Sequence, residues 1–195
     1  MDCVIDPGGS SQSPQVNVIS PAHRGPPLPP FSAVYRAEFA FVVRSLRRLG
    51  VAPGDLEDLT HDVFMTAFRR RDTFDPSRPI RPWLFGIAFR LSADFKRLVR
   101  HSRETPLDPG EESPDGGQAP DEAAALAQDR QLVLVALSRI ELARRAVLIM
   151  HDIEELPVPQ IAEALDIPPG TAYSRLRAAR IDFGEAVRAL RQEEV

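Results

Sequence analysis

Apolar residues recur at intervals of three and four along much of the chain, a pattern typical of helices that bury one face. The first such run ends at Gly50, a residue suited to the left-handed C-cap of a helix. A second run begins near Asp55, a good N-cap residue, and a third begins at Pro82, because proline is tolerated in the first helical turn. The pattern therefore predicts three successive helices in the first half of the chain.

The second predicted helix has two faces of opposite character. Its acidic face carries Glu57, Asp58, His61 and Asp62 within about two turns, and Asp58 and Asp62 repel each other mildly at this spacing. A solvated surface and a docking surface both fit such a face. The stripe expected in the core consists of Leu56, Leu59, Val63, Phe64 and Ala67.

The third predicted helix combines an apolar band with cations and aromatic rings. Such rings beside guanidinium groups suit single-stranded nucleic acid, because bases stack on the rings while cations follow the phosphates. Packing in the core is the alternative interpretation of the aromatic residues. The candidate residues for binding a single strand are Arg78, Arg81, Trp83, Phe85, Phe89, Arg90, Lys96 and Arg97.

The second half of the chain predicts further helices. An alanine-rich helix is expected from about Asp121 through Leu137, and Ser138 with Glu141 predicts a capping box for the next one. Two short helices follow, joined by a turn at Asp166. The residues expected to line the inside of the first short helix are Val158, Ile161, Ala162 and Leu165.

The two short helices predict a helix-turn-helix, in which the start of the second helix reaches base edges in the major groove. That second helix opens at 168–171 and is expected to run through Arg180. Tyr173, Ser174 and Arg177 are placed to face bases. Thr171, Arg175 and Arg180 are better placed for phosphates, and Gly170 is a further candidate residue of this DNA-binding set.

Composition and charge divide the chain into segments. Residues 1–30 are rich in proline and predict a disordered arm, whereas residues 104–122 hold seven acidic and no basic residues and predict a flexible linker. Between them, residues 31–103 carry a net charge of +6, the electrostatic footprint of a nucleic-acid binder. Residues 31–103 and 123–195 are therefore the two expected helical domains.

The 195-residue chain is 43% apolar, and its longest apolar run, Leu132 to Leu137, is far shorter than a bilayer crossing requires. Met1-Asp2-Cys3 begins acidic and predicts no signal peptide, so a cytoplasmic protein without membrane insertion is expected. Cys3 is the only cysteine, which excludes a disulfide framework and a cysteine zinc cluster within the chain.

Several short runs of residues follow one another in a recognisable order. In the first half these are Glu57-Asp58-Leu59, Asp62-Val63-Phe64, Ala67-Phe68-Arg69, Trp83-Leu84-Phe85, Ile87-Ala88 and Asp94. This order resembles the second conserved region of bacterial RNA polymerase sigma factors, with the greatest likeness to the small extracytoplasmic-function class. The resemblance implies that the acidic helix docks on the clamp helices of the polymerase and that the basic aromatic helix melts and reads the minus-ten element.

The second half adds a matching series. Its runs are Leu156, Ile161-Ala162-Glu163-Ala164-Leu165, Ile167-Pro168, Gly170-Thr171, Ser174-Arg175-Leu176 and Ala179-Arg180. They resemble the fourth conserved region of the same class, which reads the minus-thirty-five element. The sequence departs from that pattern where Asp166 replaces a customary turn glycine, and aspartate can adopt the left-handed conformation at some cost.

Together these features predict an all-α protein of two small helical domains that acts as an alternative sigma factor. Its expected partners are core RNA polymerase, promoter DNA and an anti-sigma factor, with no cofactor, no bound metal and no enzymatic activity of its own. A helix-turn-helix regulator with a protein-interaction domain, and a polymerase-binding protein that has lost promoter opening, are the alternatives. The sigma hypothesis expects Phe85, Phe89 and Arg90 to face solvent, and the alternatives do not.

Overall fold

The structure, a computed structural model, describes residues 30–102 and 121–193, and every regular element within these ranges is helical. The predicted arm at 1–30, apart from its last residue, lies outside the described residues. The predicted linker at 104–122, apart from its last two residues, also lies outside them. The boundaries proposed for the two domains therefore stay predictions.

The first three helices form one bundle: α1 (Phe31–Arg48), α2 (Leu56–Arg69) and α3 (Ile80–Ser102). The predicted end of α1 is confirmed, because Gly50 adopts the left-handed conformation with φ of +83°. The predicted start of α3 is wrong by two residues. Pro82 still lies within the first turn, where its missing N–H leaves no helical hydrogen bond unmade.

The apolar stripe predicted for α2 is confirmed. Leu59, Val63, Phe64 and Ala67 are buried against α1 and α3, and Leu56 is half-buried at the rim of the core. Burial of this stripe fixes the rotation of α2 about its axis. The opposite, acidic face is consequently turned to solvent.

The second bundle contains α4 (Asp121–Ser138), α5 (Leu142–Leu148), α6 (Val158–Leu165) and α7 (Pro169–Glu193). A short π-helical segment, Ile149–Ile153, continues α5. The last helix is longer than predicted, because the apolar residues of its second half pack on α4 and α5. It is therefore both the second helix of the helix-turn-helix and a helix that packs along α4 and α5 within the bundle.

The capping box predicted from Ser138 and Glu141 is wrong. Glu141 is itself the N-cap of α5, and its carboxylate accepts from the backbone N–H groups of Ala143 at 3.0 Å and Arg144 at 3.1 Å. The Ser138 hydroxyl instead donates to the Val135 carbonyl, 2.7 Å away, because α4 extends through this serine. A glutamate can thus satisfy the free N–H groups that the prediction assigned to a serine.

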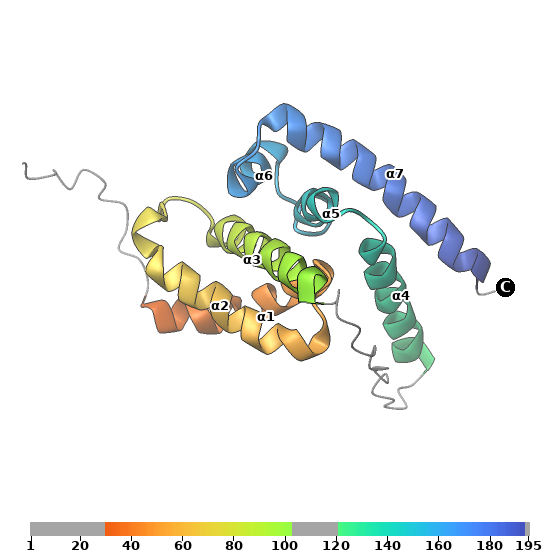
Figure 1. The fold of residues 1–195 in the computed structure, drawn as a ribbon, viewed down its shortest axis with the longest axis horizontal. Helices are drawn as coiled ribbons and strands as arrows, with labels where there is room; N and C mark the ends of the chain where they lie inside the picture. Colours follow the sequence, from red (N-terminus) through yellow and green to blue (C-terminus); the bar gives the residue numbers. More distant parts are fainter. Residues whose placement is uncertain (1–29, 103–120, 194–195) are drawn as a thin grey trace, which may run out of the picture.

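The two bundles pack against each other through α3 and α6, with further contacts between α1 and α4 (Figure 1). In Figure 1, α3 lies between the pair α1 and α2 on one side and α5 and α6 on the other. Buried apolar side chains of both bundles form one continuous cluster. In the described ranges, no helix has the length and apolar content required to cross a bilayer.

Candidate nucleic-acid interface

The acidic face of α2 is exposed along its whole length. Glu57, Asp58, His61 and Asp62 all face solvent, on the side opposite the buried stripe. Asp55 is the N-cap by position, although its side chain makes no capping hydrogen bond. The four predicted docking residues are therefore brought together on one accessible surface.

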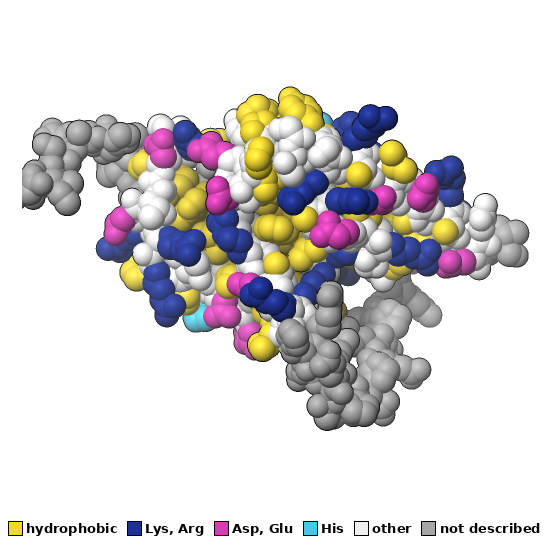
Figure 2. All heavy atoms as spheres, turned by 45° about the horizontal axis from the view of Figure 1, so that its top comes forward, with side chains coloured by type: hydrophobic (Ala, Val, Ile, Leu, Met, Phe, Trp, Pro, Cys, Tyr) yellow, Lys and Arg dark blue, Asp and Glu magenta, His cyan; other side chains and the backbone are white. Residues whose placement is uncertain are grey.

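The residues predicted to bind the minus-ten element are dispersed over α3 and the loop before it. Arg78, Arg81, Arg90 and Arg97 are exposed, and Trp83, Phe89 and Lys96 are half-buried. These residues lie on different sides of α3, because Arg81 contacts Glu38 of α1 whereas Arg90 lies against Ala164 of α6, so they do not form a single basic patch. Figure 2 likewise shows Lys and Arg side chains spread over the molecule and interspersed with acidic ones.

The predicted exposure of Phe85 is wrong. Its side chain is 1% exposed and belongs to the core cluster. The physical reason is the position of α3, which is covered by α1 and α2 on one side and by α6 on another, so that residues 84–88 are all buried. An aromatic residue at this position contributes burial of apolar area and is unavailable for stacking on a base.

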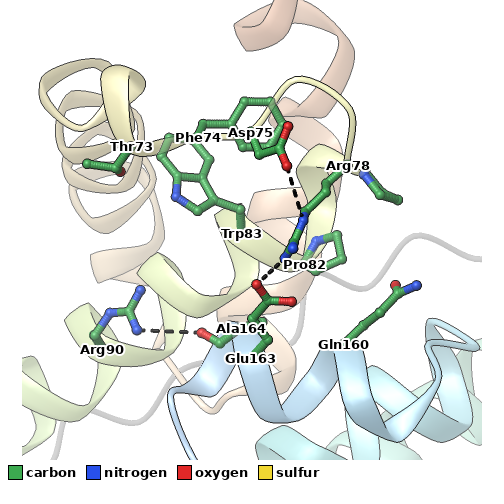
Figure 3. A pocket seen from close by; sticks show the side chains of 11 residues that line it. Thr73, Phe74, Asp75, Arg78, Pro82, Trp83, Arg90, Gln160, Glu163 and Ala164 are labelled. Carbon is green, nitrogen blue, oxygen red and sulfur yellow. Dashed lines mark hydrogen bonds and ion pairs between the residues drawn. The ribbon is translucent and has the colours of Figure 1, made fainter. Parts of the chain in front are cut away.

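A pocket of about 580 Å³ lies where the loop before α3 and the start of α3 meet α6 (Figure 3). Arg78 points between Asp75 of its own loop, at 3.3 Å, and Glu163 of α6, with which it forms an ion pair. Phe74 and Trp83 pack together above it with ring centroids 5.1 Å apart. The pocket thus joins an aromatic pair and a guanidinium of the first bundle to a carboxylate of the second.

Other predicted DNA-binding cations also have acidic or carbonyl partners. Arg81 donates to Glu38 at 2.8 Å, and Arg97 donates to Asp94 at 2.7 Å. Exposed pairs of this kind contribute little stability, so phosphates can compete for these guanidinium groups.

Lys96 points inward instead of toward solvent. Its amine donates to the Leu49 carbonyl at 2.6 Å, at the C-terminal end of α1. Burial, with a smaller contribution from the neighbouring Arg145, lowers the pKa of Lys96 to about 8. In this arrangement the side chain caps a helix and is not presented to DNA.

Arg145 is a buried residue that the sequence analysis did not single out. Its guanidinium donates to the carbonyls of Leu49 at 2.8 Å, Ser138 at 2.7 Å and Ile140 at 2.7 Å, so it ties α1 to the segment between α4 and α5. Burial lowers its pKa. Its burial could have been predicted from the sequence, because Arg145 lies three residues after the apolar Leu142, on the side of α5 that faces the core.

The helix-turn-helix forms as predicted. Asp166 takes the left-handed conformation, with φ of +56°, and joins α6 to α7. The inside residues of α6 predicted from sequence are all buried: Val158, Ile161, Ala162 and Leu165. This burial holds α6 and α7 at a fixed angle to each other and presents the start of α7 outward.

The predicted base-facing residues lie on the outer side of α7. Tyr173, 58% exposed, Ser174 and Arg177 all face solvent. The other predicted residues lie beside them: Gly170 and Arg180 are exposed, and Thr171 and Arg175 are half-buried. The structure therefore brings the seven predicted residues together on the first three turns of one helix.

Arg180 is partly engaged within the protein. Its guanidinium donates to both carboxylate oxygens of Asp152, at 2.6 and 2.9 Å, and His151 lies 2.6 Å from the same carboxylate. Hydrogen bonding from Arg180 lowers the pKa of Asp152. This pair joins the π-helical segment to α7 and holds the arginine on one side of the recognition helix.

Two family models match the chain: sigma-70 region 2 over residues 34–102 and sigma-70 region 4 over residues 130–182. The chain is 31% identical over 160 residues to the ECF RNA polymerase sigma factor SigL of Mycobacterium tuberculosis, covering 82% of this chain and 85% of the relative. It is 28% identical over 142 residues to the RNA polymerase sigma factor NccH of Alcaligenes xylosoxydans xylosoxydans, covering 71% and 76%.

A similar fold occurs in the sigma factor RpoE of Bartonella quintana, solved in complex with the anti-sigma factor NepR. The TM-score is 0.60 at 19% identity, and the match covers 81% of this chain and 96% of that one. Both bundles thus correspond, in order, to the two regions of one protein family. The chain belongs to the extracytoplasmic-function class of RNA polymerase sigma factors, the alternative sigma factors that direct promoter recognition.

Proposed function

We propose that this sigma factor docks on core RNA polymerase through the acidic face of α2, which comprises Glu57, Asp58, His61 and Asp62. The observation that carries this assignment is the full exposure of all four side chains on one side of a helix whose other side is buried. Acidic groups at an interface rim steer a basic partner and fix its register. The polymerase supplies the catalysis, and the sigma factor acts in the cytoplasm without a catalytic site of its own.

We assign the minus-ten element to residues of α3 and of the loop before it. Arg78, Arg81, Arg90 and Arg97 are exposed cations, and Trp83 and Phe89 are half-buried rings that can stack on unpaired bases. Phe85 is not part of this surface because it is buried. Lys96 is not part of it either, because its amine donates to the Leu49 carbonyl. Melted promoter DNA would then follow the cations while flipped bases meet the rings.

We assign the minus-thirty-five element to the start of α7, where Tyr173, Ser174 and Arg177 would enter the major groove. An anti-sigma factor is the third partner that we propose. The relatives are sigma factors, and the RpoE structure of similar fold holds an anti-sigma factor. Such a partner would compete with the polymerase or with the promoter for the surfaces named above.

Arg177→Ala should weaken binding to a minus-thirty-five duplex by about 1–3 kcal/mol and relax the preference at one base step, because an arginine can form a bidentate contact with guanine. Arg175→Ala should weaken binding to all sequences alike, because it removes a phosphate contact. It should also reduce the steepness of the plot of log binding constant against log salt concentration by about one. The measurement is fluorescence anisotropy with a duplex library over a salt series. An identical, sequence-independent loss in both variants would refute the orientation assigned to α7.

A further inference from the structure

The outer side of the α1 and α2 pair carries an aromatic seam, formed by Phe31, Tyr35 and Phe39 of α1 and Phe68 of α2. Tyr35, Phe39 and Phe68 are 39%, 40% and 42% exposed, and Phe31 is half-buried. Neighbouring rings are in contact, with centroids 5.1 Å apart for Phe31 and Phe68 and 5.4 Å apart for Tyr35 and Phe39. Figure 1 shows α5 and α6 on the opposite side of α3. Contiguous exposed rings of this kind mark an interaction surface.

Charged residues of opposite sign lie on the two sides of this seam. On α2, Glu57 and His61 precede Phe64 and Phe68 at spacings of three and four, so the acidic face begins at the seam. On α1, the side turned away from α2 is basic. This basic face of α1 consists of three exposed residues: Arg36, Arg44 and Arg47.

The charges on both faces lack internal partners. Within residues 30–102 and 121–193, no side chain of the acidic face of α2 or of the basic face of α1 forms an ion pair. By contrast, Arg81 of α3 is paired with Glu38 of α1 at 2.8 Å. The two faces therefore offer unpaired charges of both signs to another molecule.

The two faces match each other in level along the helices. Early residues of α1 pack on late residues of α2, with ring centroids 4.6 and 5.1 Å apart, so the two helices run antiparallel. Continuing this pairing places Asp62 almost level with Arg36 and Asp58 within one turn of the level of Arg44. A two-fold axis parallel to the seam exchanges the two sides and keeps the level. Acidic groups of one copy would then meet basic groups of the other.

We propose that this side of the first bundle is a self-association surface, on which a second copy of the chain docks about a two-fold axis parallel to the aromatic seam. A two-fold dimer uses the same patch on both subunits, so the patch must be complementary to itself. The seam meets this condition with rings at the axis, and the two flanking faces meet it with opposite charges. Salt screens exposed charges, so the dimer should weaken as salt rises.

Analytical ultracentrifugation of the full chain measures this dimer. The weight-average mass should rise with protein concentration from the 21.6 kDa of one chain towards twice that value. Phe39→Ser should raise the dissociation constant at least about tenfold, because buried aromatic anchors carry much of the energy of an interface. Ile181→Ser on α7, 53% exposed, is the control and should leave it unchanged. A monomer at every concentration, or equal effects of the two variants, would overturn the proposal.

Two charge-reversed variants test the arrangement of the faces. Arg36→Glu with Arg44→Glu makes both faces acidic, and Asp58→Arg with Asp62→Arg makes both faces basic. Each variant alone should dimerise at least about a hundredfold more weakly than the wild type, because like charges would meet across the axis.

Arg188→Glu with Arg191→Glu, both exposed on α7, is the matched control for the first variant, since the change in net charge is the same. It should dimerise within about threefold of the wild type. An equal loss in this control would show that net charge governs association and would overturn the proposal.

An equimolar mixture of the two charge-reversed variants gives the decisive result. Each acidic face of one variant now meets a basic face of the other, so a mixed dimer should form within about threefold of the wild-type affinity. Variants that had lost their fold could not regain association in this way. If the two variants stayed monomeric when mixed, the two-fold arrangement would be wrong.

One consequence rests on the proposed function of the acidic face: Asp58 and Asp62 cannot contact the polymerase and a second copy together. Titration of the wild-type dimer with core RNA polymerase should therefore yield complexes that hold a single sigma chain. Binding of the intact dimer would refute the docking assignment on α2 and leave the dimer standing. A monomeric chain that binds polymerase through Asp58 and Asp62 would refute the dimer and leave the docking assignment standing.

Discussion

Asp58→Arg combined with Asp62→Arg should weaken binding to core RNA polymerase at least about a hundredfold while the protein stays folded. Both side chains are exposed on the acidic face of α2, and their reversal places like charges against a basic partner, which costs several kcal/mol. Exposed substitutions change stability by only about 0.5 kcal/mol. Binding is measured by titrating labelled sigma factor with purified core enzyme.

Asp129→Arg with Glu185→Arg is the matched control, because both residues are exposed on the second bundle and the change in net charge is the same. This control should bind core polymerase within about threefold of the wild type at moderate salt. If both double variants lost binding equally, net charge and not the acidic face would govern association. Full binding by the Asp58 and Asp62 variant would reject the docking assignment.

Arg145→Met should lower the free energy of unfolding by about 2–4 kcal/mol. Arg145 is only 4% exposed, and its loss removes a charged donor from the carbonyls of Leu49, Ser138 and Ile140. Buried carbonyl groups without a donor are costly, and methionine fills the space without replacing the hydrogen bonds.

Urea unfolding followed by circular dichroism measures this change, with Arg139→Met as the control. Arg139 forms an exposed ion pair with Glu193 at 2.9 Å, so its replacement should cost less than about 1 kcal/mol. Equal losses in the two variants would mean that the buried hydrogen bonds of Arg145 contribute no more than a surface pair.

The sequence was sufficient to predict features that depend on local periodicity and turn chemistry. The stripe from Leu59 to Ala67 is buried because a period of 3.6 residues determines which side chains share a face. The left-handed turn at Asp166 follows from the tolerance of aspartate for positive φ. The exposed face of α2 is the complement of the buried stripe, so it could be predicted as well.

The features that were missed depend on contacts between distant parts of the chain. Phe85 is an aromatic residue of the kind that can stack on bases, but it is buried because other helices enclose α3. No local sequence pattern reveals that enclosure. The packing of α6 on α3, where Gly86 faces the Ala164 carbonyl, joins residues far apart in sequence. Likewise Glu141 replaced Ser138 as the N-cap because α4 extends through the serine, and helix ends are poorly specified by sequence.

Run-off transcription with purified core RNA polymerase on a genomic promoter library tests most directly whether the two bundles act together as a sigma factor. We expect discrete transcripts that appear only when the chain is added, from templates that share two elements at a fixed spacing. These transcripts should be lost with the Asp58 and Asp62 double reversal. Sequence-specific binding of DNA through α7 without any such transcripts would contradict the assignment and favour a helix-turn-helix regulator.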